Sequence, residues 1–200
     1  MADHYKSLDK LKKDSVEGID YKEILLDRSS DVTIMAIHGG IIERGTAQIA
    51  ETIAGNDLNY FSFSGLKKPR IKYHITSHKF NHDGLAALLK NSDIAVSFHG
   101  TRKKGLEDYV SIGGLNEKLK GIIMVNLALK DFNVDTKNYP AKSYKNVANR
   151  PKNNGVQLEL GRSLRNSFFD NIKSKKRKPT ISFYKFTDAI RRSIEYYYKI

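Results

Sequence analysis

Three apolar runs along the chain have the character of strands buried on both faces. Residues 32–37 are rich in β-branched side chains and almost continuously apolar, and residues 93–100 (DIAVSFHG) and 155–161 (GVQLELG) are similar. Such runs are typical of strands that are covered on both sides in a parallel sheet. Two of the runs end in a histidine followed by glycine, at 38–39 and 99–100, so polar groups are expected where these strands finish.

Helical and alternating patterns lie between these runs. Residues 46–54 predict a helix that Thr46 caps and Gly55 ends, and residues 83–91 predict another. The remaining predicted elements are a short charged helix within residues 1–30, strands at 58–65 and 70–77, and a helix that begins near Asn116. The end of the chain predicts an amphipathic helix, because its apolar residues recur at helical spacing: Phe183, Phe186, Ile190, Ile194 and Tyr197. Strands that alternate with helices predict an α/β fold, a three-layer sandwich around a mixed, largely parallel sheet.

No internal repeat or clear linker divides the chain. Its 200 residues and 22.7 kDa fit a single domain over residues 1–200, with residues 1–16 as a peripheral N-terminal segment. The polar stretch 149–155 and the basic stretch 173–179 (KSKKRKP) are interpreted as surface loops.

Composition adds a strong electrostatic signal. The formal net charge is +13 and the isoelectric point is about 9.7, which predicts an anionic partner. Nucleic acid, an acidic lipid surface and an acidic polymer all satisfy this charge. The chain has no cysteine, which excludes disulfides and thiol chemistry, so a zinc site would need histidine and carboxylate ligands. No apolar run suggests a secretory signal or a membrane span, so we expect synthesis in the cytoplasm without a signal peptide.

Candidate chemistry gathers at the ends of the buried strands. His38, His99 and Glu159 lie at or near carboxyl ends of predicted strands, where α/β sheets place their functional groups. Glycines 39 and 40 allow a sharp turn that brings Glu43 back towards His38. Two imidazoles and one carboxylate that leave a position open for water form the pattern of a catalytic zinc site. Solvated strand ends are the alternative interpretation of the same residues.

The other histidines give weaker signals. His74, His78 and His82 have the spacing of one helical face, but the strand pattern of residues 70–77 argues against a helical ligand set there. His4 is interpreted as a surface residue. Glu159 interrupts an otherwise apolar strand, so it either faces outward or could transfer protons beside a metal.

Arginines surround the same strand ends. Arg150, Arg162 and Arg165 bracket the strand that carries Glu159, and Arg102 follows the second His-Gly pair. The guanidinium group can hold a carboxylate through two hydrogen bonds, so these residues are candidates for binding an acidic substrate. Ordinary solvated charge is the alternative for at least one of them.

Four blocks of sequence, taken together, carry a family resemblance. AIHGGIIERGT, SFHG, YVSIGGLNEKL and NVANRPKNNGVQLELGRSLR resemble the poly-γ-glutamate hydrolases of bacteriophages and bacilli, and the resemblance extends from about residue 17 to the end of the chain. It implies a fold similar to the zinc carboxypeptidases and a zinc-dependent hydrolase that cuts γ-glutamyl amide bonds. It also implies one zinc ion per chain, held by His38, Glu43 and His99, with Glu159 as the catalytic glutamate.

The resemblance further implies that Asn149 and Arg150 form a clamp for a substrate carboxylate, although the pair follows the second zinc histidine here and precedes it in carboxypeptidases. Poly-γ-glutamate carries one carboxylate per residue, which would explain the positive charge.

We expect a monomer that acts on this polymer and is released by cell lysis. Two alternatives stay open: a zinc peptidase or amidase that acts on γ-glutamyl links of the cell wall, and a nucleic-acid-binding protein without enzymatic activity. The second is disfavoured because no helix shows a basic recognition face.

Overall fold

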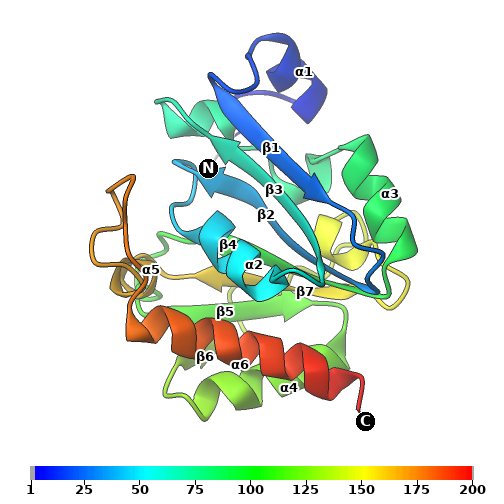
Figure 1. Cartoon of the computed structure of the whole chain (residues 1–200), viewed down its shortest axis with the longest axis vertical. Helices are drawn as coiled ribbons and strands as arrows, with labels where there is room; N and C mark the ends of the chain where they lie inside the picture. Colours follow the sequence, from blue (N-terminus) through cyan, green and yellow to red (C-terminus); the bar gives the residue numbers. More distant parts are fainter. Residues whose placement is uncertain (1–2, 200) are drawn as a thin grey trace.

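A seven-stranded β-sheet organises the chain in this computed structural model, which describes residues 3–199. The strands are β1 (Tyr21–Leu26), β2 (Val32–Gly40), β3 (Asn59–Gly65), β4 (Ile94–Gly100), β5 (Tyr109–Gly114), β6 (Asn133–Asp135) and β7 (Gly155–Leu160). They follow one another across the sheet in the order β1-β3-β2-β4-β7-β5-β6, which can be traced in Figure 1.

The central strands are parallel, and antiparallel pairs join the edges to them. β2 pairs in parallel with both β3 and β4, β4 pairs in parallel with β7, and β5 pairs in parallel with β6. β1 is antiparallel to β3, and β5 is antiparallel to β7. The sheet is therefore mixed and largely parallel, as the strand and helix pattern predicted.

Two cores cover the two faces of the sheet. The first packs β2, β4, β5 and β7 against α2 (Thr46–Ala54), α4 (Glu117–Ala128) and α6 (Ile181–Tyr197). The second packs the opposite face against α1 (Leu8–Lys13), α3 (Asp83–Asn91) and the short 3-10 helices η1 (Arg70–Tyr73) and η3 (Val147–Asn149). A third 3-10 helix, η2 (Ser77–Lys79), lies between η1 and α3 in the chain. One further helix, α5 (Arg162–Ser167), follows β7 directly.

The alternation of side chains along each strand assigns residues to these two cores. Ile34 and Ala36 of β2 belong to the first core, whereas Met35 and Ile37 belong to the second. Burial of each large apolar side chain contributes roughly 1.5–3 kcal/mol, so both layers stabilise the sheet. None of the helices among residues 3–199 is long and apolar enough to cross a bilayer.

Three expectations about local structure were wrong. Residues 70–77 form η1 and the start of η2 rather than a strand. The side chains of Tyr73 and Ile75 are both buried in the second core, which gives the alternating pattern of a strand, but this segment does not pair with the sheet. Thr46 is the first helical residue of α2 and does not cap it; its buried hydroxyl donates to the Glu43 carbonyl at 2.9 Å. The N-terminal segment is less peripheral than expected, since Leu8 and Leu11 are fully buried in the second core.

Candidate metal and catalytic centre

Neighbouring strand ends bring the predicted residues together. His99 of β4 and Glu159 of β7 are paired in register, and both lie on the face of the sheet opposite the first core. The register of β2 against β3 shifts between Ala36 and Gly39, and such a bulge re-aims side chains. His38, within this irregularity, lies beside His99 with their ring centroids 4.9 Å apart.

The turn after β2 returns Glu43 to the same place. Gly40 has a φ of 65°, in the left-handed region that favours glycine, and a Cβ there would lie 2.2 Å from the Gly65 carbonyl oxygen. The Glu43 amide then donates to the His38 carbonyl at 3.0 Å, which closes the loop. The sequence-based prediction that the glycines allow this turn is confirmed.

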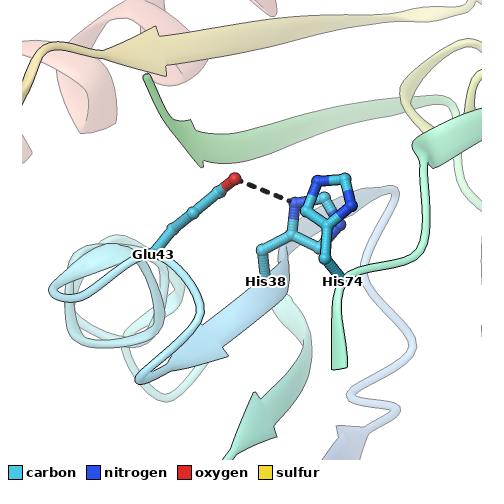
Figure 2. A group of neighbouring side chains, drawn as sticks. All are labelled: His38, Glu43 and His74. Atoms are coloured by element: carbon cyan, nitrogen blue, oxygen red, sulfur yellow. Dashed lines mark ion pairs between the residues drawn. The ribbon is translucent and has the colours of Figure 1, made fainter. Parts of the chain in front are cut away.

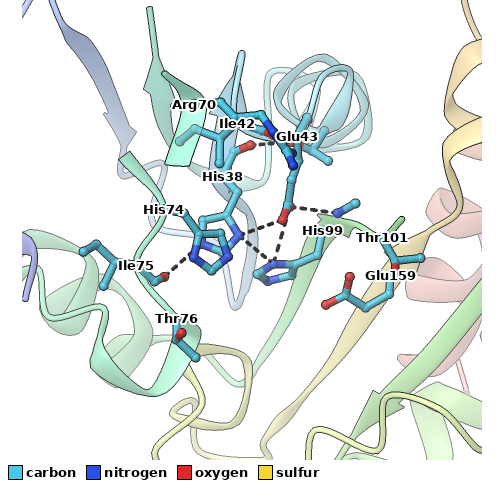
Figure 3. A network of polar contacts seen from close by, with 12 residues as sticks. His38, Ile42, Glu43, Arg70, His74, Ile75, Thr76, His99, Thr101 and Glu159 are labelled. Carbon is cyan, nitrogen blue, oxygen red and sulfur yellow. Dashed lines mark hydrogen bonds and ion pairs between the residues drawn. The ribbon is translucent and has the colours of Figure 1, made fainter. Parts of the chain in front are cut away.

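Two ring nitrogens and the two oxygens of one carboxylate lie close enough together to hold a zinc ion. His38 Nδ1 lies 3.1 Å from His99 Nδ1 and 3.3 Å from Glu43 Oε1, and His99 Nδ1 lies 3.8 Å from Glu43 Oε2. Zinc bonds of 2.0–2.2 Å at tetrahedral angles place donor atoms about 3.3–3.5 Å apart. All three side chains are buried or nearly so, and their dashed contacts are drawn in Figure 3. The residues therefore fit a zinc ion with one position left for another group.

Hydrogen bonds behind the rings orient the two imidazoles. The Ile75 carbonyl oxygen lies 2.8 Å from His38 Nε2, and a carbonyl only accepts, so Nε2 carries the hydrogen and Nδ1 is free to bind. Ser97 Oγ lies 3.0 Å from His99 Nε2 and can accept a hydrogen from it, which would leave Nδ1 of the second ring free as well. Partners of this kind orient metal ligands and raise their basicity.

A third histidine, which the sequence analysis set aside, joins this group. A ring nitrogen of His74, one of His38 and an oxygen of Glu43 lie within 4.8 Å of one another. The His74 ring stacks on that of His38 with centroids 4.2 Å apart, as Figure 2 shows. Its Nδ1 is occupied by Asp3 at 2.9 Å, which leaves Nε2 free. The same Asp3 oxygen accepts from the backbone and hydroxyl of Thr76.

The charges within the group are strongly coupled. Burial alone would raise the pKa of Glu43, but the His38 charge and its hydrogen bond outweigh burial and lower it to about 2. Burial would lower the pKa of His38, whereas the Glu43 carboxylate raises it above its ordinary value. Burial, and then the His38 charge, lower the pKa of His99 to about 3. Without a metal, one proton therefore sits on His38 between the other two groups, where a cation could replace it.

Glu159 has the environment of a proton-transfer group. Burial raises its pKa well above the ordinary value, and the Glu43 carboxylate raises it further against the opposing charge of Arg165. Its Oε1 accepts from Gln157 Nε2 at 3.1 Å. A cavity of about 310 Å³ is lined by Glu43, His74 and Glu159 among others, so a substrate there would reach the carboxyl group. A raised pKa makes the carboxylate a better proton acceptor, and the carboxyl group that forms can return the proton.

The structure separates the predicted substrate-binding residues into two groups. Arg102 and Arg162 are exposed and line a cavity that adjoins the metal group, and buried Arg165 lies beneath them. Asn149 instead donates to the carbonyls of Ala141 and Ser143.

The Arg150 side chain likewise forms hydrogen bonds with the backbone, because it donates to the carbonyls of Lys145 and Phe80. These contacts fix loops around the site. The carboxylate clamp at Asn149 and Arg150 stays a prediction to which they add no support.

Several residues around the centre were missed from the sequence. Ser97 could have been found, because it lies two residues before His99 on the same strand and therefore on the same face. Asp3 and His74 could not, because only the packing of the N-terminal segment against the loop after η1 brings them together.

Comparison with known proteins adds independent information. The family described as Poly-gamma-glutamate hydrolase matches residues 5–189. In Bacillus subtilis (strain 168), UPF0714 protein YmaC is 30% identical over 176 residues, 84% of this chain and 74% of its own. UPF0714 protein YndL of the same strain is 27% identical over 202 residues, 96% of this chain and 78% of its own.

Two solved structures share the fold over nearly the whole chain. "Structure of Bacteriophage poly-gamma-glutamate hydrolase" has a TM-score of 0.94 with 27% identity and covers 99% of both chains. "YNDL-apo (Zinc-free)" has a TM-score of 0.88 with 26% identity and covers 97% of this chain and 98% of the other.

Proposed function

Because the chain belongs to the poly-gamma-glutamate hydrolase family, we propose that it is a zinc-dependent enzyme that hydrolyses γ-glutamyl amide bonds of poly-γ-glutamate. One observation carries the zinc dependence: His38 Nδ1, His99 Nδ1 and the Glu43 carboxylate meet at 3.1–3.8 Å. The zinc-free state named for the similar structure supports the same metal.

The chemistry divides between the ion and the protein. Zinc, held by His38, Glu43 and His99, would supply a Lewis acid that polarises the scissile carbonyl and activates water. The remaining steps belong to Glu159, whose carboxylate takes a proton from the attacking water and returns it to the departing nitrogen. The raised pKa of Glu159 suits both halves of this transfer.

The surrounding cations account for recognition of the polymer. Arg102 and Lys103 line the cavity that contains Glu159, next to the Tyr139 hydroxyl. Cations fixed in a partly enclosed cavity neutralise the carboxylates that flank the bond. The net charge of +13 then serves an acidic polymer and does not require nucleic acid.

A comparison of two variants with and without a chelator tests this function. Wild-type protein should shorten purified poly-γ-glutamate, and a chelator should stop the cutting until zinc is restored. His38→Ala should lose both zinc and cutting, whereas Glu159→Gln should keep zinc and lose cutting. Full cutting in the presence of chelator would exclude the metal, and cutting of cell-wall fragments but not of the polymer would favour the amidase alternative.

A further inference from the structure

A strongly basic cavity lies beside the proposed catalytic cavity. Its volume is about 370 Å³, in the lower part of the range of ligand sites, and none of its lining residues within 3–199 is acidic. It is lined by two lysines and by five arginines, Arg44, Arg70, Arg102, Arg162 and Arg165. A cavity with this lining is suited to an anion that carries more than one charge.

The basic cavity is continuous with the catalytic one. Ile42, Arg70 and Arg102 line both cavities, and the catalytic cavity also contains Glu43 and Glu159. A ligand that extends from the basic cavity would therefore pass directly over the metal group.

A further cavity that reaches the metal group is much less basic. This third cavity, of about 310 Å³, is also lined by Glu43, His74 and Glu159, and Lys142 is its single lysine. No arginine contributes to its lining among residues 3–199. The positive charge around the centre is therefore concentrated in the basic cavity and in the cavity that shares Arg70 and Arg102 with it.

The same strand ends that carry the site residues also position the arginines. Arg44 directly follows Glu43, Arg102 lies just after the end of β4, and Arg162 begins α5 just after the end of β7. Arg165, 5% exposed, donates to the carbonyls of Leu160, Arg44 and Thr101 and so fixes this arrangement.

Most of these cations lack an acidic partner. Arg44, Arg102 and Arg162 form no ion pair with any other residue of the described part of the chain. Burial, followed by the charges of Arg70, Arg162 and Arg44, lowers the pKa of Arg102. Like charges held together without a counter-charge repel one another, and an anion bound between them relieves this repulsion.

We propose that the basic cavity is a subsite that binds two or more consecutive carboxylates of the polymer on one side of the bond to be cut. This rests on the proposed function, because the polymer supplies the regularly spaced carboxylates. Cleavage should therefore depend on polymer length on that side, and short oligomers that do not reach the cavity should be poor substrates.

Paired substitutions test the subsite by binding and by kinetics. Arg44→Gln with Arg162→Gln removes one half-buried and one exposed cation that line the basic cavity but not the catalytic one, and their side chains make no hydrogen bond within residues 3–199. Lys90→Gln with Lys185→Gln removes the same charge from exposed positions on α3 and α6. The arginine pair should raise KM for long polymer by about tenfold or more, the loss expected for one charge-assisted hydrogen bond, with kcat nearly unchanged. KM for the shortest oligomer that is cut should not change.

Binding to catalytically inactive protein separates this inference from the proposed function. Titration of long polymer into Glu159→Gln should show that the added arginine substitutions weaken binding and the lysine substitutions do not. Equal weakening by both pairs, or none by the arginine pair, would overturn the subsite even if the wild-type protein cuts the polymer. Loss of binding to duplex DNA but not to polymer in the arginine variant would also overturn it.

Discussion

Removal of the hydroxyl behind His99, a ligand in the proposed zinc site, should weaken zinc binding without disrupting the rest of the site. Ser97 is fully buried, and its Oγ lies 3.0 Å from His99 Nε2. In Ser97→Ala the His99 ring loses its hydrogen-bond partner at Nε2, and a buried group left unpaired costs about 1–3 kcal/mol. The other two proposed ligands, His38 and Glu43, are unchanged in this variant, so we expect the zinc dissociation constant to rise about 10–100-fold, or about 1.4–2.7 kcal/mol.

Competition with a zinc-binding dye at fixed pH measures this change. Ser92→Ala is the matched control, because Ser92 is also fully buried and lies near the other end of β4. Its hydroxyl forms hydrogen bonds with Thr33 Oγ1 at 2.7 Å and with the Leu88 carbonyl at 2.9 Å. The control should lose comparable stability against denaturant but keep the wild-type zinc affinity. Unchanged affinity in Ser97→Ala, or equal weakening in both variants, would refute the role assigned to Ser97.

Three further predictions concern the same centre. Glu159→Gln should lower turnover about 10²–10⁴-fold at unchanged zinc content, and normal turnover would remove Glu159 from proton transfer. The pKa of His38 is raised and that of His99 is about 3, so zinc binding below the His38 pKa should displace one proton. The logarithm of the zinc affinity should therefore fall by one for each unit by which the pH is lowered, and a slope of two in pH-dependent titrations would contradict this. Asp3→Ala should lower the free energy of unfolding by about 1–3 kcal/mol in denaturant titrations. Burial would raise the pKa of Asp3, but its hydrogen bonds to Thr76 and His74 lower it below the ordinary value. The loss of unfolding free energy in Asp3→Ala should therefore be complete above the ordinary Asp pKa of about 3.9 and should shrink as the pH falls below it. A loss that stays constant with pH would argue against these hydrogen bonds.

The sequence predicted the central sheet better than its edges. β2, β4 and β7 are continuous apolar runs because both faces are covered, and this pattern is visible without tertiary information. β1 was missed because it lies at the edge of the sheet, where Leu25 and Leu26 are exposed and the inward residues do not alternate cleanly. β6 has only three residues, too few for a pattern.

The candidate site was predicted only as far as strand ends and family resemblance could reach. His38, His99 and Glu159 follow from their positions at strand ends, whereas the contribution of His74 depends on a loop that packs beside β2. Tyr73 and Ile75 are buried at alternating positions, so the sequence pattern predicted a strand where the chain forms this loop. Local pattern cannot distinguish an alternation that pairs with a sheet from one that only packs against it.

The pairing of His99 with Glu159 across β4 and β7 has a consequence for how the protein folds. His38 and His99 are 61 residues apart in the chain, and the partner of His99 lies on a strand that comes much later in the sequence. Contacts between such distant segments form slowly, since long loops must close before they can form. Zinc binding, which needs His38 and His99, should therefore appear once β2 and β4 have paired. Turnover, which also needs Glu159, should appear only after β7 has docked against β4.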